Sequence, residues 1–236
     1  MQISIVYDNY PYDPAFRPGS GFACIIRTPR NLILFDSGGH GSTLLYNLQK
    51  LGLPPHRIDT IAISHLDSDH YGGLLSLLEE TKSPSVYVPV IFPGRFKRNI
   101  GSHGGQVREV LAPQEICPSV YTTGELGGGI KEQSLVVKSE SGGVLIVGCG
   151  HPSVAETAEA ARRVVGEKLY MVVGGFHLGG LEMFELQEVC ARLRTVGVNQ
   201  VAPSHCTTDT GTAYLRGEFG DGFIESGVGR TIEFGS

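Results

Sequence analysis

The chain has 236 residues and a formal net charge of −5, and 41% of its residues are hydrophobic. An acidic chain without a run of about 20 apolar residues is unlike a nucleic-acid-binding protein or a membrane span, so we expect neither partner. This length favours a single globular domain, which we assign to residues 1–236.

The chain begins with a predicted strand over residues 2–7. Its first residues contain no basic segment followed by an apolar core, so we expect no signal peptide. Residues 8–21 contain three prolines and several aromatic residues, and they predict a loop that either packs on the surface or faces a ligand. Residues 21–27 and 31–35 then predict a hairpin, and residues 42–51 predict a helix that Gly52 ends.

The segment Ile58–Leu75 reads IDTIAISHLDSDHYGGLL. Ile61 and Ile63 alternate with smaller residues, which is typical of a strand, and a helix is expected over residues 70–80. The turn between them carries potential metal ligands, namely His65, Asp67, Asp69 and His70.

Spacing assigns these four side chains to two groups. Residues two apart on an extended segment point the same way, so His65 and Asp67 would share one metal ion. Asp69 and His70 lie where the chain turns into the helix, so they would serve a second ion. A simpler alternative is that Asp69 is only the N-cap of the helix.

After a strand over residues 85–90, residues 91–106 carry basic side chains among aromatic residues and glycines: Arg95, Lys97, Arg98 and His103. We expect a flexible basic loop, which would either hold an anionic group of a substrate or remain solvated. Further strands are predicted over residues 107–111, 119–122, 133–138, 143–147, 168–173, 200–202 and 227–234, and helices over residues 153–165, 181–195 and 208–216.

Several of these later strands also end in potential ligands, namely Cys149 with His151, then His177, then His205. If the strand ends face one edge, these side chains converge with those of residues 65–70 on a single metal site. The five cysteines are scattered and include no C-x-x-C pair, which favours a reducing, cytoplasmic setting over a disulfide framework.

The segment from His65 to His70 resembles the H-x-H-x-D-H hallmark of the metallo-β-lactamase superfamily, with Asp67 in place of the second histidine. The segments FDSGG, LLYNLQKLGL, GC-x-HP, GGFHL and SHCT are similar to one branch of that superfamily. The branch contains the archaeal dihydropterin–aminobenzene ribofuranosyl phosphate synthase and uncharacterised bacterial relatives. The resemblance implies an α/β fold, a four-layer αββα sandwich.

The resemblance also implies a ligand set for two divalent ions. His65, Asp67 and His151 would hold the first ion, and Asp69, His70 and His205 the second. Cys149 stands where the superfamily has a bridging aspartate and would replace it, and His103 is the one upstream alternative to His151 as the third histidine.

Other residues receive supporting roles from the same resemblance. Asp36 would orient a ligand histidine, or otherwise form a helix cap or Asx turn. His177 would act as general acid or touch the substrate, and Asp69 would also orient the attacking hydroxide. The carboxylate of Asp67 shifts the expected metal from zinc toward iron or manganese.

Three functions remain open. The first is a metal-dependent hydrolase of an ester, lactone or phosphoester of a small anionic molecule, bound through Arg95, Lys97 and Arg98. The second is a pterin-type transferase, in which the metals and the basic loop activate a pyrophosphate leaving group. The third is a non-catalytic or redox-sensing metal protein that uses Cys149 and Cys206.

Overall fold

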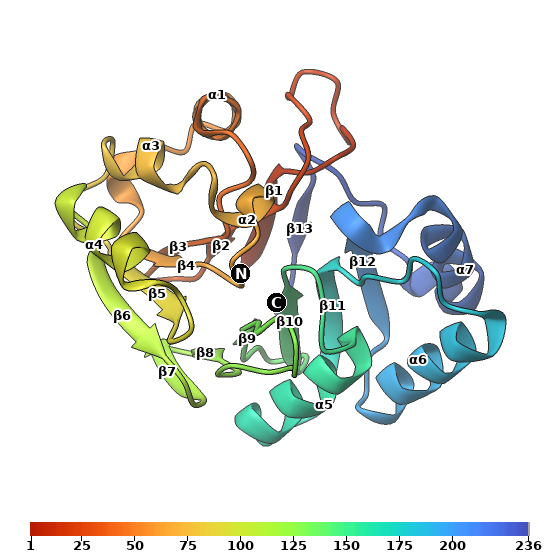
Figure 1. Cartoon of the computed structure of the whole chain (residues 1–236). Helices are drawn as coiled ribbons and strands as arrows, with labels where there is room; N and C mark the ends of the chain where they lie inside the picture. The colour runs from red at the N-terminus through yellow and green to blue at the C-terminus, as the bar shows by residue number, and fades with distance from the viewer. Residues whose placement is uncertain (236) are drawn as a thin grey trace. The chain divides into compact units, whose positions relative to one another are not determined.

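The computed structural model describes residues 1–235, and the chain forms two compact units. Unit 1 comprises Met1–Leu111 and Gly227–Phe234, and unit 2 comprises Ala112–Ser226. Each unit contains its own β-sheet with its own helices (Figure 1). The single domain expected over residues 1–236 stays a prediction.

Unit 1 contains a seven-stranded sheet in the order β13-β1-β2-β3-β4-β5-β6. Its strands are β1 (Gln2–Tyr7), β2 (Ala23–Arg27), β3 (Leu32–Phe35), β4 (Thr60–Ala62), β5 (Ser85–Pro89), β6 (Gln106–Val110) and β13 (Thr231–Glu233). Its helices are α1 (Gly41–Lys50), α2 (Ser68–Tyr71), α3 (Leu74–Leu78) and α4 (Gly94–Ser102), with a 3-10 turn at Pro55–Arg57. Strands β3 to β6 run parallel, so their carboxyl ends lie along one edge of the sheet.

The core of unit 1 lies between its sheet and its helices. Leu44 and Leu48 of α1 and Leu74 of α3 belong to the same buried cluster as Leu34 and Ile61 of the sheet. The apolar stripe of each helix therefore faces the strands, which fixes the turns after β3 and β4 at the sheet edge.

Unit 2 contains a six-stranded sheet in the order β12-β11-β10-β9-β8-β7. Its strands are β7 (Gln114–Cys117), β8 (Val120–Thr122), β9 (Leu135–Val137), β10 (Gly143–Val147), β11 (Leu169–Gly175) and β12 (Gln200–Ser204). Its helices are α5 (Val154–Val165), α6 (Met183–Thr195) and α7 (Asp209–Phe219), with 3-10 turns at His205–Thr207 and Gly220–Gly222. Strands β10, β11 and β12 are parallel neighbours, whereas β7, β8 and β9 pair antiparallel.

The three long helices of unit 2 pack against its parallel strands (Figure 1). Ala158 of α5, Leu193 of α6 and Leu215 of α7 share one buried cluster with Leu145 and Val172 of the sheet. Helix α5 begins where the sequence predicts, because the hydroxyl of Ser153 accepts a hydrogen bond from the backbone N–H of Ala155. These helices hold the carboxyl ends of β10, β11 and β12 at one edge.

The segment of residues 91–106 is not the flexible loop that its glycines and basic residues predict. It contains α4, which begins after Pro93 and buries Ile100, while Phe96 packs beside the core of unit 1. The prediction was wrong because two apolar residues four apart suffice to anchor a short amphipathic helix, whatever the charge of its outer face.

The single helix predicted over residues 70–80 is divided into α2 and α3 at Gly72 and Gly73. A Cβ atom at Gly72 would lie 2.2 Å from the carbonyl oxygen of Gly39, and one at Gly73 would lie 2.3 Å from that of Ser37. The two glycines therefore allow the segment after β3 to approach the backbone closely, and this approach interrupts the helix.

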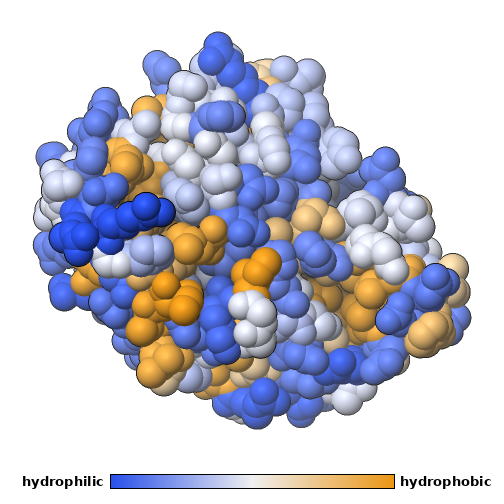
Figure 2. Space-filling model, viewed as in Figure 1, coloured by the Kyte–Doolittle hydropathy of each residue, from blue (hydrophilic) through white to orange (hydrophobic). Residues whose placement is uncertain are grey.

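Apolar side chains also reach the surface, as with Ile91, Leu111 and Phe184, which are more than half exposed. In Figure 2 the apolar areas of the viewed face are separated by hydrophilic ones. Among residues 1–235, every helix is too short or too polar to cross a bilayer.

Candidate functional site

Asp36 is the centre of a buried hydrogen-bond network in unit 1. It directly follows β3, is fully buried, and has a left-handed φ of 57°. Its Oδ1 accepts a hydrogen bond from the backbone N–H of Ser64 at 2.6 Å, and its Oδ2 accepts one from the Ser64 hydroxyl at 2.7 Å. The same Oδ2 accepts a hydrogen bond from Nδ1 of His70 at 2.7 Å.

This network fixes the proton of each imidazole. A carboxylate only accepts hydrogen bonds, so His70 Nδ1 carries a proton. The Ser64 hydroxyl already donates to Asp36, so His65 Nδ1, 2.8 Å from that oxygen, also carries a proton. In the neutral form of both rings Nε2 therefore carries the lone pair, and this is the atom that a metal would bind.

The ligand atoms of His65 and Asp67 are close together. Nε2 of His65 lies 3.3 Å from Oδ2 of Asp67, and the His65 and His70 ring centroids are 4.2 Å apart. Two atoms that both carry lone pairs repel each other at this distance unless a cation or a proton lies between them. Two ligand atoms on a tetrahedral metal ion are separated by about 3.4 Å, which matches the observed distance.

Asp69 is half-buried on α2, beside the loop of residues 8–21. A Cβ atom at Gly21, whose φ is 127°, would lie 2.0 Å from the carbonyl oxygen of Asp69. That part of the loop therefore packs tightly on α2. Tyr7 is fully buried nearby, and burial raises the pKa of its hydroxyl, with the charge of Asp69 adding to the rise.

Unit 2 gathers a second set of side chains at the ends of its parallel strands. Cys149 follows β10, His177 follows β11, and Cys206 lies in the 3-10 turn after β12. One ligand atom of each of these three residues lies within 4.8 Å of the other two. The thiol of Cys206 donates to the carbonyl oxygen of Cys149 at 3.4 Å.

The loop that carries Cys149 and His151 is held by Glu132. This glutamate is 2% exposed and precedes β9, and its carboxylate accepts hydrogen bonds from the backbone N–H groups of Cys149, Gly150 and His151 at 3.0 Å. Sequence reasoning missed Glu132. It lies 17 residues before Cys149 and outside any motif, so no signal in the chain marks it.

The thiol of Cys206 is unusually acidic. A hydrogen bond with the side chain of Cys149, helped by His177, lowers the pKa of Cys206 from its usual 9.0 to about 7. Burial has the opposite effect on Cys190 in the core of unit 2, where it raises the pKa of the thiol to about 11.

The remaining histidines of unit 2 also lie at strand ends. The ring centroids of His151 and His177 are 4.7 Å apart, and His205 is buried at the start of the turn after β12. His177 and His205 have left-handed φ values of 47° and 52°. Such a conformation costs free energy in a residue other than glycine, and it is common at functional sites.

The basic residues expected to contact a substrate lie on α4. Nζ of Lys97 is 3.0 Å from Oε2 of Glu109 and donates to the carbonyl oxygen of Val90 at 2.8 Å, so Lys97 is bound within unit 1. Arg95 and Arg98 are exposed. His103 closes the helix, and its Nδ1 donates to the carbonyl oxygen of Asn99 at 2.8 Å.

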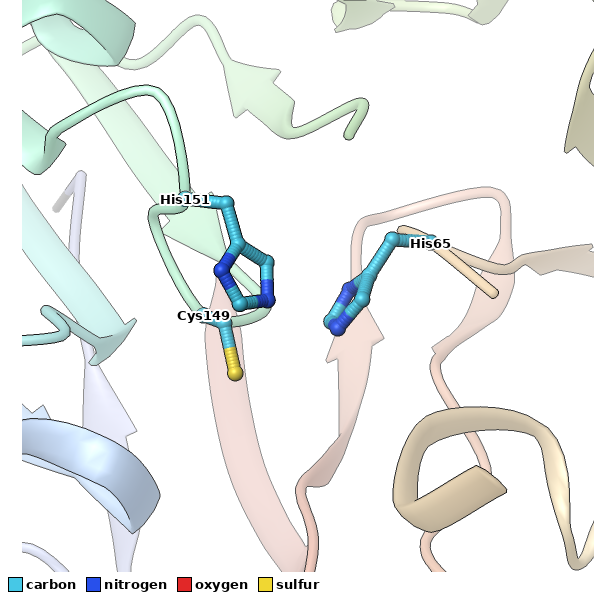
Figure 3. A group of neighbouring side chains, drawn as sticks. All are labelled: His65, Cys149 and His151. Carbon is cyan, nitrogen blue, oxygen red and sulfur yellow. The ribbon is translucent and has the colours of Figure 1, made fainter. Parts of the chain in front are cut away.

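The structure thus brings the predicted site residues together in two sets. Unit 1 gathers Asp36, His65, Asp67 and His70, and unit 2 gathers Cys149, His177 and Cys206, with His151 beside His177. Figure 3 shows Cys149 and His151 on the same loop after β10, and it also draws His65, which follows β4. Imidazole, carboxylate and thiol are the groups that bind zinc, iron and manganese in proteins, so both sets fit a divalent metal.

Comparison with known proteins finds a match to one family model and two relatives. Residues 16–116 match the profile of the metallo-beta-lactamase superfamily. A protein of Methanocaldococcus jannaschii named 7,8-dihydropterin-6-methyl-4-(beta-D-ribofuranosyl)-aminobenzene-5'-phosphate synthase is 25% identical, over 98% of this chain and 95% of its own length. The uncharacterized protein MJ0448 of the same organism is 26% identical, over 87% of this chain and 90% of its own.

Among solved structures, Tm1679, a metal-dependent hydrolase of the beta-lactamase superfamily, has a TM-score of 0.82 and 24% identity. The match covers 100% of both chains. At this identity the likeness shows the fold, and it confirms the α/β fold class of metallo-β-lactamase type that the sequence predicts.

Proposed function

We propose that this chain is a metal-dependent hydrolase of the metallo-β-lactamase superfamily that acts on a small, anionic ester, lactone or phosphoester. The observation that carries the proposal is the pair of lone-pair atoms in unit 1, Nε2 of His65 and Oδ2 of Asp67, which are 3.3 Å apart. The ring of His70 is close to that of His65, with ring centroids 4.2 Å apart, and this third potential ligand favours a metal ion over a proton as the shared partner.

The proposed ligand set would hold two divalent ions. His65, Asp67 and His151 would hold the first ion, and Asp69, His70 and His205 would hold the second, with Cys149 as a further thiolate ligand. Ions held in this way would activate a water molecule as nucleophile and polarise an oxygen of the substrate.

The roles of the other side chains follow from their hydrogen bonds. Asp36 holds the His70 ring by Nδ1 and acts through Ser64 on Nδ1 of His65, so both rings keep Nε2 directed outward. The carboxylate of Asp69 orients the attacking water and accepts its proton, and His177 protonates the leaving group.

We assign to Arg95 and Arg98 the binding of the anionic group of the substrate. Both are exposed on α4, whereas Lys97 already has Glu109 as its partner. Guanidinium groups bind carboxylate and phosphate through two parallel hydrogen bonds, so an anionic group is the chemistry that this helix would recognise.

A second candidate is a transferase that activates a pyrophosphate leaving group. It is favoured by the full-length similarity to the Methanocaldococcus jannaschii synthase. In that case the same cations would neutralise the departing phosphates, and no water would enter the product.

The two functions differ in the fate of water. Purified protein loaded separately with zinc, iron or manganese is assayed with a phosphodiester, an aryl ester and a lactone in ¹⁸O-labelled water. The hydrolase proposal expects turnover with label in the product, and the loss of turnover in the His70→Ala variant. Specific binding of a dihydropterin diphosphate without labelled product would favour the transferase instead.

Arg98→Ala and Arg95→Ala test the assignment of the substrate. Because they lie outside the metal ligands, they should raise KM for anionic substrates about tenfold and leave kcat and metal content unchanged. The matched control is Lys97→Ala, which removes a residue already bound to Glu109 and should change KM less.

A further inference from the structure

We propose that unit 2 holds a divalent ion of its own, a soft cation such as Zn²⁺, on the sulfur atoms of Cys149 and Cys206 and a ring nitrogen of His177. This site goes beyond the proposed dinuclear centre, because it uses Cys206 and His177 as ligands and needs no residue of unit 1. With the ion bound, His177 is a ligand in place of the general acid of the proposed hydrolase.

The sheet of unit 2 dictates the position of the three side chains. Val147 of β10 is the neighbour of Gly174 of β11, and Gly175 of β11 is the neighbour of Ser204 of β12. Each ligand follows one of these parallel neighbours by no more than two residues, so all three lie at the same edge of the same sheet. The register therefore fixes their proximity.

Two further features hold the sulfur atoms close to each other. Glu132 fixes the backbone of the Cys149 loop through three N–H groups. Gly175 supplies the space, since a Cβ atom there would lie 2.8 Å from Sγ of Cys206 and 2.3 Å from the carbonyl oxygen of Gly148. Only glycine allows the thiol to rest over the neighbouring strand end.

The turn after β12 is tied to the end of β11 as well. The Thr207 hydroxyl donates to the carbonyl oxygen of Ser204 at 2.7 Å and accepts a hydrogen bond from the backbone N–H of Phe176 at 3.2 Å. Cys206 and His177 are each next to one of these bonded residues, so they belong to one rigid assembly.

The distances and the donor chemistry suit zinc. Ligand atoms on tetrahedral zinc with bonds of about 2.0–2.3 Å are separated by about 3.6–3.8 Å, and the three atoms of unit 2 lie within 4.8 Å of one another. Small side-chain rotations close this gap. Two thiolates and one imidazole form a soft donor set, which prefers zinc to manganese or magnesium.

The site has the composition of an open zinc site. His177 is exposed, while Cys149 is 5% exposed, so the fourth coordination position is on the His177 side and faces water. A thiolate sulfur has lone pairs for two ions, so Cys149 can serve this site and the proposed dinuclear centre together.

The test uses Co²⁺ as a spectroscopic stand-in for Zn²⁺, added to the full-length, metal-free protein under reducing, anaerobic conditions. Thiolate bound to Co²⁺ gives a charge-transfer band in the near ultraviolet whose intensity follows the number of sulfur ligands. We expect one ion per chain beyond those of the proposed dinuclear centre, with the intensity of two thiolates. Cys206→Ser should halve that intensity and weaken binding at least about tenfold.

Two variants complete the design. Cys117→Ser removes a half-exposed thiol from β7 and should leave the band unchanged. Asp67→Asn alters only unit 1, at a side chain that is 46% exposed, and should also leave the band unchanged. An unchanged band in Cys206→Ser, or loss of the band in Asp67→Asn, would overturn the site.

Turnover measured on the same samples separates this site from the proposed function. A two-thiolate band that responds to Cys206→Ser in protein without hydrolytic turnover supports the site, although the hydrolase proposal would then fail. Active protein whose thiolate band is the same in wild type and in Cys206→Ser overturns the site and leaves the hydrolase proposal intact.

Discussion

The two units use a buried carboxylate in different ways. In unit 1, Asp36 accepts a hydrogen bond from the ring of a proposed ligand, His70, and reaches a second ring through Ser64. In unit 2, Glu132 accepts hydrogen bonds only from the backbone of the ligand loop. The first arrangement selects which ring nitrogen can bind a metal, whereas the second fixes where the loop lies and leaves the side-chain chemistry unchanged.

The two units also differ in the atoms that they offer to a metal. Unit 1 offers nitrogen and oxygen from His65, His70 and Asp67, whereas unit 2 adds the sulfur of Cys149 and Cys206. A carboxylate favours harder cations and a thiolate favours softer ones, so the two units should respond differently when the metal is changed.

The largest effect is expected for Asp36→Ala. It leaves the N–H of Ser64 and the Nδ1 proton of His70 buried without their acceptor, which should lower the free energy of unfolding by roughly 3–5 kcal/mol. Urea denaturation measures this loss. Asp36→Asn is the informative partner, because its amide would donate to His70 and move the ring proton to Nε2. That variant should remain folded and lose metal, and full metal content in it would contradict the role of Asp36.

A smaller loss of stability is expected for Glu132→Ala. Three buried N–H groups lose their acceptor, which should cost roughly 2–4 kcal/mol of unfolding free energy. Glu132→Gln is the variant to compare with Asp36→Asn. Its side chain keeps one acceptor oxygen and contacts no ring of a proposed ligand. Glu132→Gln should bind the metals of unit 1 as the wild type does. Equal metal loss in Asp36→Asn and Glu132→Gln would contradict the difference proposed between the two carboxylates.

Ser64→Ala tests the relay to His65, by which we mean the two hydrogen bonds that join Asp36 to the Ser64 hydroxyl and that hydroxyl to Nδ1 of His65. The Ser64 hydroxyl lies 2.8 Å from Nδ1 of His65 and accepts its hydrogen bond, so its removal should cost about 1–2 kcal/mol and weaken binding of the first ion about tenfold. Ser37→Ala is a matched control, since the buried Ser37 hydroxyl donates only to the carbonyl oxygen of His70. If both variants lower metal affinity equally, the relay has no specific role.

The smallest effect concerns the pH dependence of cysteine reactivity in unit 2. In the metal-free protein, alkylation of Cys206 should have a midpoint near pH 7, while Cys190, with its pKa of about 11, should react only at high pH. In Cys149→Ala the midpoint should rise toward the usual pKa of 9.0, because the hydrogen bond from that side chain is lost. Mass spectrometry of the labelled peptides gives both midpoints.

The lowered pKa of Cys206 also determines whether the stability of the folded protein rises or falls with pH. The folded chain holds the Cys206 thiolate at a pH where the unfolded chain still binds the proton, so stability of the metal-free protein should rise from pH 7 to pH 9. This contribution is lost as the pH falls through 7. A flat stability curve across that window would contradict the lowered pKa.

The strand ends could be predicted from the sequence because their pattern is local. Alternating β-branched residues, a polar turn and an apolar helix marked the turns that carry His65, Cys149, His177 and His205. The hydrogen bond from His70 to Asp36 agrees with the orienting geometry that the family resemblance implied.

Features that depend on tertiary contacts could not be predicted from a local sequence pattern. Glu132 acts on a loop far along the chain, and α4 forms because Phe96 and Ile100 find the core of unit 1. The short strand β7 was also missed, since Gln114 and Glu115 are exposed and carry no apolar alternation. In each case the missing information is the identity of the packing partner.

The central proposal is that His70 and His205 hold one divalent ion, and metal content in His70→Ala, His205→Ala and the double variant tests it most directly. If the two histidines share one ion, each single variant should lose about one ion per chain, and the double variant should lose that same ion and no more. If the double variant loses two ions, or if both single variants keep their full metal content, the shared centre does not exist.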